Sequence, residues 1–300
     1  MIMIKLGIVS LESTHVDAFC RIFNSDSSEP THIEGAVVAA LCDQDDDPGR
    51  IASLQRDWGI EVIVNEPRDI TGMVDAVLIC SRDGAEHLRQ ATPFLEAGLP
   101  VFVDKPLALS LDDANDMLHL SIEHGAPLMS ASGLRYAEEV AAALAKIGDE
   151  EIVHASMIGP GELFFYGIHL TDLLNTLMGP GVQAVSNVGE LEFDLLSVTY
   201  GDGRSASLQL LREPAPRHQG TLFTADDAVG FEIHENTFYM RMMSSFIEMI
   251  ESREPPILYE DMMEPLLLLL AAERSQKQNG RAVRLAEIRS DRESLQPTIH

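Results

Sequence analysis

Short apolar runs alternate with helical segments through the first 125 residues, and this alternation constrains the fold more than any other feature of the sequence. The runs predict strands over residues 4–9, 35–41, 62–64, 75–80 and 101–103. The intervening segments predict helices over residues 14–23, 50–58 and 85–97, and a further helix over 111–124 follows. Strands and helices that alternate at short spacing favour a parallel, doubly wound sheet.

The pattern changes after residue 125. Strands are predicted over residues 151–158, 182–188, 195–200, 205–211, 221–224 and 229–233, and helices over 137–146, 168–178, 238–252 and 260–277. Successive strands joined by tight turns such as Gly201-Asp202-Gly203 indicate an antiparallel or mixed sheet. We therefore expect an α/β protein with a Rossmann-like, doubly wound domain over residues 1–125. An α+β domain with a large, mostly antiparallel sheet should follow over residues 126–300.

Composition narrows the class of partner. Acidic residues outnumber Lys and Arg by 48 to 21, so the formal net charge is −27. Nucleic acid and anionic membranes would be repelled, which favours a small-molecule ligand. Cys20, Cys42 and Cys80 have no C-x-x-C spacing and predict reduced core thiols rather than a metal site. No uncharged stretch reaches about 18 residues, and the amino terminus runs directly into a strand, so we expect a cytoplasmic protein.

The segment Val103-Asp104-Lys105-Pro106 places a charged amine directly after a predicted buried strand. Ligands of open α/β sheets bind outside the carboxyl ends of the strands. Lys105 is therefore a candidate for chemistry, and Pro106 fixes the backbone behind it. The alternative is that Lys105 is an ordinary solvated lysine at a strand end.

The turn after the first strand departs from the glycine-rich sequence that usually holds a dinucleotide pyrophosphate. It begins at Gly7, but Ser10 and Glu12 stand where close-approach glycines are expected, and a carboxylate would repel the phosphates. Ser13, Thr14 and the helix N-terminus could hold a phosphate instead. An ordinary helix start with Ser13 or Thr14 as N-cap explains the same residues.

Asp43 follows the second predicted strand, where an acid can bind the adenosine ribose hydroxyls. A carboxylate there favours NAD over NADP, because it would face the 2′-phosphate of NADP. Asp45, Asp46 and Asp47 follow closely, so a solvated acidic loop is an equally good interpretation.

Four short motifs follow one another along the chain. They are Val77–Cys80 with His87 in the next helix, Val103-Asp104-Lys105-Pro106, Gly167-Ile168-His169-Leu170-Thr171-Asp172, and the closing segment Ser275–Leu285 with Gly280-Arg281. Together they resemble the Gfo/Idh/MocA oxidoreductases, the relatives of glucose-fructose oxidoreductase and inositol dehydrogenase, over nearly the whole chain. The second is similar to the family's Glu-Lys-Pro motif with Asp for Glu, and the third to its Gly-x-His-x-x-Asp helix.

This resemblance implies a dinucleotide-binding Rossmann domain and a sheet domain whose exposed face forms a homo-oligomer. It implies hydride transfer between NAD(P) and a carbon of a sugar, cyclitol or similar polyol. Lys105 would hydrogen-bond the reacting hydroxyl, and His169 would act as acid or base. Asp172, three residues along the same helix, would orient the imidazole or simply cap a surface.

The other candidate residues divide by role. Cofactor contacts are expected from Gly7, Ser10, Ser13, Thr14, Asp43, Ser81, Arg82, His87 and Asp104, and substrate contacts from Arg135, Tyr136 and Tyr166. Arg82, Arg135 and Tyr136 are as consistent with exposed polar positions after strands. Phe165 stands where the family frequently places an acid, so Tyr166 or Glu162 would have to replace that acid if either does more than pack or face solvent.

Two functions remain open. Lys105, His169 and Asp43 favour an NAD-dependent oxidoreductase, with NAD preferred to NADP. Ser10 and Glu12 favour a family member that has lost hydride transfer and binds a small molecule or regulates another protein, because a fold alone does not establish an activity.

Overall fold

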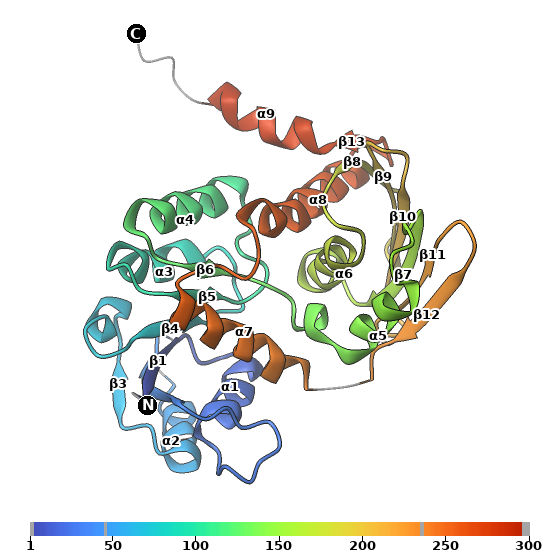
Figure 1. Cartoon of the computed structure of the whole chain (residues 1–300). Coiled ribbons are helices and arrows are strands. Elements are labelled where there is room, and N and C mark those ends of the chain that lie inside the picture. The colour runs from blue at the N-terminus through green and yellow to red at the C-terminus, as the bar shows by residue number, and fades with distance from the viewer. Residues whose placement is uncertain (1–2, 45–46, 235–236, 296–300) are drawn as a thin grey trace. The chain divides into compact units, whose positions relative to one another are not determined.

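The computed structural model describes residues 3–44, 47–234 and 237–295. Contacts divide the chain into two compact units, Met1–Ala131 with Tyr239–Tyr259, and Ser132–Phe238 with Glu260–His300. Each unit contains its own sheet (Figure 1). The division predicted after residue 125 keeps residues 239–259 with the second domain, whereas their contacts lie within the first unit. Asp45 and Asp46 of the predicted acidic loop lie outside the described residues.

The first unit contains the predicted parallel sheet. Its strands are β1 (Ile4–Val9), β2 (Ala36–Cys42), β3 (Val62–Val64), β4 (Ala76–Ile79), β5 (Val101–Val103) and β6 (Leu128–Met129). They lie in the order β3-β2-β1-β4-β5-β6, and every pair is parallel. This order confirms the Rossmann-like, doubly wound fold and brings the ends of β1 and β4 together, where ligands of such sheets bind.

Five α-helices of the described chain pack in this unit: α1 (Thr14–Asn24), α2 (Pro48–Trp58), α3 (His87–Glu96), α4 (Leu111–His124) and α7 (Phe238–Ser252). Helix α7 belongs to this unit from Tyr239 onward, and a short 3₁₀ helix, η1 (Pro67–Ile70), also lies here. Phe102 of β5 contacts Phe19 of α1 and Phe246 of α7, each with ring centroids 5.9 Å apart. The two helices therefore share one face of the sheet, and burial of Phe246 explains why the chain returns to this unit.

The second unit contains a seven-stranded mixed sheet. Its strands are β7 (His154–Pro160), β8 (Val182–Asn187), β9 (Phe193–Tyr200), β10 (Ser205–Leu211), β11 (Gln219–Phe223), β12 (Ala228–Glu232) and β13 (Val283–Arg284). Their order is β12-β11-β7-β10-β9-β8-β13. Only β7 and β10 pair in parallel within the described sheet, so it is mostly antiparallel, as predicted.

The helices of this unit are α5 (Glu138–Ile147), α6 (Leu163–Met178), α8 (Tyr259–Lys277) from Glu260 onward, and α9 (Leu285–Leu295), with a short turn η2 (Gly133–Tyr136). The start predicted for α6, residue 168, is wrong by five residues, since the helix begins at Leu163. A Cβ at Gly167 would lie 3.0 Å from Leu269 of α8 and 3.2 Å from Leu210 of β10. Glycine thus lets α6 pack closely against both elements.

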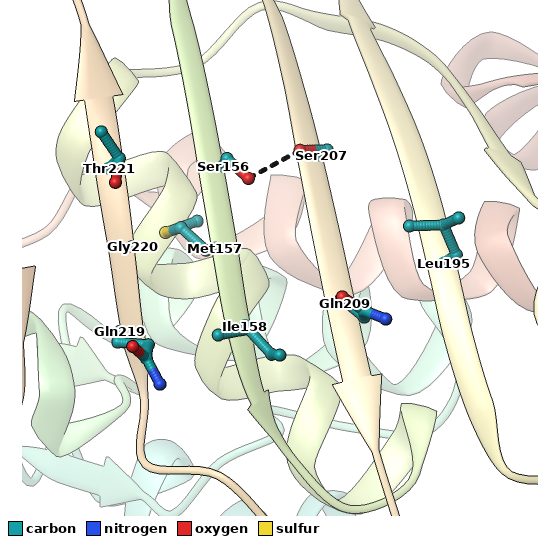
Figure 2. Close-up of a pocket in the computed structure, with 9 residues that line it drawn as sticks. All are labelled: Ser156, Met157, Ile158, Leu195, Ser207, Gln209, Gln219, Gly220 and Thr221. Atoms are coloured by element: carbon teal, nitrogen blue, oxygen red, sulfur yellow. Dashed lines mark hydrogen bonds between the residues drawn. The ribbon is translucent and has the colours of Figure 1, made fainter. Parts of the chain in front are cut away.

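The other face of the second sheet is exposed in the described chain. Along β10, buried residues alternate with half-buried ones, which is typical of a sheet covered on one side. Figure 2 shows side chains from four neighbouring strands on this face, including a hydrogen bond of 3.1 Å between Ser207 and Ser156. They border a shallow hollow of about 280 Å³.

Two further observations concern the chain as a whole. Cys20, Cys42 and Cys80 are buried free thiols, as predicted. Burial, followed by the charge of Asp17, raises the pKa of the Cys20 thiol to about 12, which makes it a poor nucleophile.

Within the described ranges, no helix has the length and apolar character that crossing a bilayer requires.

Candidate functional site

Ser10 holds the turn between β1 and α1 in the bend that a glycine usually provides. Its φ of 63° lies in the left-handed region, which disfavours residues other than glycine. Its backbone N–H donates to the carbonyl of Cys42 at 3.0 Å. Its hydroxyl accepts a hydrogen bond from Gln90 Nε2, also at 3.0 Å. The turn therefore keeps a glycine-like backbone while adding a hydroxyl.

Glu12 turns its carboxylate toward the loop that follows β4. Oε1 accepts the backbone N–H of Arg82 at 2.7 Å, although both side chains are exposed. An amide at this edge of the sheet is the kind of donor that a phosphate oxygen uses. The carboxylate therefore occupies a donor that a bound phosphate could otherwise take.

Ser13 is the N-cap of α1. Its Oγ accepts the backbone N–H of His15 at 3.2 Å, which confirms one of the two predicted caps. Thr14 is the first residue of the helix and is exposed. The amide groups of this first turn form the positive end of the helix dipole, so the turn can still attract an anion.

Gly7 and Asp43 have local structural roles in this unit. A Cβ at Gly7 would lie 2.8 Å from Ile70 Cδ1, so packing against η1 accounts for this glycine. Asp43 is only 4% exposed at the end of β2, and its Oδ2 accepts the backbone N–H of Asp47 at 3.0 Å. The carboxylate thus holds the backbone of Asp47, the N-cap residue of α2.

Lys105 follows a buried acid, Asp104, that belongs to a partly buried chain of hydrogen bonds. Asp104 Oδ1 accepts the backbone N–H of Lys105 at 2.8 Å, and Oδ2 lies 2.5 Å from His15 Nδ1. A carboxylate only accepts, so His15 donates through Nδ1 and accepts the Tyr239 hydroxyl at Nε2, at 2.7 Å. Burial, and then the charge of Asp104, raises the pKa of Tyr239. The chain Tyr239–His15–Asp104 therefore holds the backbone at Lys105.

His87 connects the loops that follow β4 and β5. It is fully buried, with Nε2 3.0 Å from the carbonyl oxygen of Ser81 and Nδ1 3.0 Å from that of Pro106. Pro106 directly follows Lys105, so His87 holds the backbone after the lysine, whereas Asp104 holds the backbone N–H of the lysine itself.

In the second unit, the buried Asp172 forms an ion pair with the half-buried Arg135. Arg135 Nη2 donates to Asp172 Oδ1 at 2.6 Å, and its Nε donates to Oδ2 at 3.3 Å. Asp172 Oδ2 also accepts the backbone N–H of Ser132 at 3.0 Å. Arg135, predicted to contact substrate, is therefore engaged by Asp172, and Asp172 fixes the backbone of Ser132.

Ser132 connects this ion pair to His169. The Oγ of Ser132 lies 2.7 Å from His169 Nδ1 and also accepts the backbone N–H of Leu134 at 3.2 Å. Asp172 thus acts on the imidazole through Ser132. Ser132 was not predicted as a site residue. Its position three residues after β6 (Leu128–Met129) could have indicated it, because ligands bind outside the carboxyl ends of such strands.

A second histidine lies beside the first. The ring of His218 lies 5.5 Å from that of His169, centroid to centroid, at an interplanar angle of 66°. Burial lowers the pKa of His218 to about 4, so the ring is neutral near pH 7. His218 was not predicted, because nothing in the local sequence connects it with His169.

Three aromatic residues complete the set of predicted positions in this unit. Phe165 and Tyr166 lie in the first turns of α6 and are 56% and 46% exposed. The ring of Tyr166 lies 6.3 Å from that of His169. Tyr136 ends η2 and is half-buried. Tyr166 is therefore a neighbour of His169, whereas Phe165 offers no ionisable group.

A family model described as "Oxidoreductase family, NAD-binding Rossmann fold", that of Gfo/Idh/MocA, matches residues 21–132. The match includes β2 to β6 and Lys105. It starts after the turn that holds Ser10 and Glu12.

Sequence relatives are inositol dehydrogenases. The chain is 28% identical over 224 residues to Inositol 2-dehydrogenase 1 of Saccharopolyspora erythraea, which covers 69% of this chain and 60% of that protein. It is 26% identical over 180 residues to Inositol 2-dehydrogenase of Pseudomonas savastanoi pv. phaseolicola, covering 57% of this chain and 51% of the relative. The matched region thus spans little more than half of these relatives.

Solved structures share the fold over almost the whole chain. A probable dehydrogenase from Thermotoga maritima has a TM-score of 0.84 at 18% identity, covering 95% of this chain and 99% of that one. Scyllo-inositol dehydrogenase from Lactobacillus casei, with bound NAD(H) and scyllo-inositol, has a TM-score of 0.81 at 19% identity with the same coverage. The chain therefore resembles the Gfo/Idh/MocA oxidoreductases, since their family model matches residues 21–132 and the two-sheet architecture is shared with these solved structures.

Proposed function

We propose that this protein is an NAD-dependent oxidoreductase that transfers a hydride between nicotinamide and a carbon of a sugar, cyclitol or similar polyol. The observation that carries the proposal is the oriented imidazole of His169, held at Nδ1 by Ser132. Asp172, which is buried and paired with Arg135, fixes the backbone of Ser132 in turn. Such support is typical of a side chain that must present one nitrogen in one direction.

His169 supplies the acid or base. Oxidation of an alcohol requires a group that takes the hydroxyl proton as the hydride leaves, and histidine is the side chain whose ordinary pKa lies closest to neutrality. Lys105 supplies a positive charge that stabilises the developing alkoxide. Its backbone is held by Asp104, whose carboxylate is 6% exposed.

The residues at the carboxyl edge of the first sheet fit a dinucleotide. Ser10 keeps the left-handed bend, and the N-terminus of α1 offers amide groups for the pyrophosphate. Asp43 directly follows β2, where it would meet the adenosine ribose, which favours NAD over NADP. Glu12 has to leave the Arg82 amide for the phosphates to bind, and its exposed side chain is able to do so. When bound, NAD accepts or supplies the hydride.

The names of the relatives direct the choice of substrate. The Saccharopolyspora and Pseudomonas relatives are named inositol 2-dehydrogenases, so cyclitols are the first candidates for this chain. The test is reduction of NAD+ with a panel of inositols and sugars, using wild type and the Lys105→Ala and His169→Ala variants. The proposal expects turnover that both substitutions strongly reduce. Turnover that survives both substitutions would refute the catalytic assignment.

One observation favours a second function, a small-molecule-binding or regulatory protein without hydride transfer. The Glu12 carboxylate already occupies the Arg82 N–H at 2.7 Å, and the region matched by the family model excludes this turn. Under this alternative, a polyol binds without NADH binding, and no substrate of the panel reduces NAD+. Calorimetry with each ligand separately distinguishes the two functions.

We also infer that the exposed face of the second sheet joins copies of the chain. Leu195 is 36% exposed there among serine, glutamine and threonine side chains (Figure 2). An uncovered sheet of this size suits a partner that presents the same surface. Light scattering of wild type and Leu195→Lys tests this, since the substitution should lower the measured mass. An unchanged mass would place the contact elsewhere or show a monomer.

A further inference from the structure

His218 is held beside His169 by two neighbouring strands. It ends the connection between β10 and β11, and its carbonyl accepts the backbone N–H of Ile233 at 2.9 Å. The two imidazole rings are T-shaped, with centroids 5.5 Å apart. The topology of the sheet thus brings together two histidines that are distant in the sequence.

Gly159 of β7 makes room for the His218 ring. A Cβ at this glycine would lie 2.8 Å from His218 Cδ2 and 3.2 Å from its Nε2. The φ of Gly159 is not in the left-handed region, so backbone conformation does not require glycine here. The close approach of the imidazole does.

The buried nitrogen of His218 has no partner in the described chain. Its Nε2 is buried and meets no hydrogen-bonding atom there. Leaving such a group unpaired costs about 1–3 kcal/mol, whereas a phenylalanine ring would fill similar space without that cost. By contrast, His154 on the same strand as Gly159 pairs its Nδ1 with Ser205 Oγ at 2.8 Å. The polar ring at position 218 therefore suits a partner that arrives with a ligand.

We propose that His218 is a second substrate-binding histidine, whose ring nitrogen hydrogen-bonds a hydroxyl of the bound polyol next to the one that meets His169. The substrate class rests on the proposed function. A neutral imidazole offers one donor and one acceptor, which matches a hydroxyl group. It adds no positive charge beside His169, so it does not oppose proton uptake there. A substrate that lacks adjacent hydroxyls leaves one of the two rings without a partner.

The experiment is ¹⁵N NMR of histidine-labelled protein during titration with myo-inositol, without NAD. The proposal expects the His218 signals to move in a saturable way while those of His154 stay in place. Calorimetry of variants accompanies it. His218→Phe keeps the ring shape but removes both nitrogens, and should weaken myo-inositol binding about tenfold, equivalent to about 1.4 kcal/mol. His218→Gln retains a donor and an acceptor and should recover most of that loss.

Gly159→Ala provides a second variant that changes no polar group. Its Cβ should displace the His218 ring and also weaken binding, whereas His154→Gln should have no effect. The proposal is overturned if the His218 signals stay unmoved up to the solubility limit of myo-inositol. It is also overturned if His218→Phe binds as tightly as wild type.

These results separate this proposal from the proposed function. Movement of the His218 signals without NAD+ reduction would support His218 as a ligand contact and refute the oxidoreductase. Turnover of myo-inositol by both wild type and His218→Phe with equal kcat/KM would support the oxidoreductase and refute the role of His218.

Discussion

The turn between β1 and α1 and the network around His169 use polar groups in opposite ways. Glu12 in the turn, and Asp43 after β2, direct their carboxylates at backbone N–H groups of the protein itself. Around His169, protein contacts fix one side of the ring, while the buried Nε2 of the neighbouring His218 has no hydrogen-bond partner among the described residues. The proposed ligand site of the second unit therefore has an unused polar group, whereas a ligand at the turn would have to compete with existing contacts.

The largest effect is expected at His169. His169→Gln should lower kcat by about 10²–10⁴-fold, because it removes the proposed acid or base. KM should change much less than kcat. Steady-state kinetics with NAD+ and the best inositol of the panel measures both, with His154→Gln as the matched control on β7. A kcat within a few-fold of the wild-type value would show that His169 is not the acid or base of the reaction.

Asp172 tests how firmly this network is built. Asp172→Asn leaves Arg135, 15% exposed, without its charge partner and should lower the free energy of unfolding by about 3–5 kcal/mol. Glu86→Gln, which breaks the exposed pair with Arg89, should cost about 0–1 kcal/mol. Urea unfolding of both variants provides the contrast. Equal losses would show that the Asp172 pair is no stronger than a surface contact.

The lowered pKa of His218 should make the stability of the protein depend on pH. Its pKa is about 4 in the folded protein against 6.5 ordinarily, so between these values the unfolded chain binds the proton more readily. The free energy of unfolding should therefore fall as the pH drops from 6.5 to 4, by on the order of 3 kcal/mol. The titratable group whose ring faces it is His169. In His218→Phe, thermal unfolding across this range should show a shallower pH dependence, and an identical one would contradict the assignment.

The smallest effect is expected at the turn. Glu12→Gly removes a negative charge near the phosphates and releases the Arg82 amide, so NADH should bind more tightly by about 1 kcal/mol, or several-fold. Glu12→Gln removes the negative charge but keeps an oxygen that can accept the Arg82 N–H, so it distinguishes the effect of the charge from that of the hydrogen bond. Unchanged affinity in both variants would mean that the Glu12 carboxylate points away from the bound dinucleotide.

The sequence predicted helices and strands correctly where the signal, such as an apolar run, lies within a single element. Apolar runs located β1 to β5, and Ser110 caps α4 through the Asp113 N–H, as the hydroxyl before a helix suggests. The start of α6 was placed five residues late because the residue at its N-cap, Glu162, makes no side-chain capping bond. A helix that starts without a cap gives no local signal.

The candidate site could be predicted only in part. Lys105 and His169 stand in recognisable motifs, so the sequence alone was enough to propose them, and their roles stay predictions. Ser132, His218 and Tyr239 were not, because their contacts join segments distant in the sequence and depend on strand order and helix packing. Such contacts leave no periodic pattern in the chain.

Calorimetric titration of the wild-type protein with NADH and with NADPH tests the central claim most directly. We expect micromolar binding of NADH and weaker binding of NADPH, because Ser10 preserves the turn and Asp43 disfavours a 2′-phosphate. Absence of binding for both would contradict the oxidoreductase and favour a polyol-binding protein whose turn is closed by Glu12.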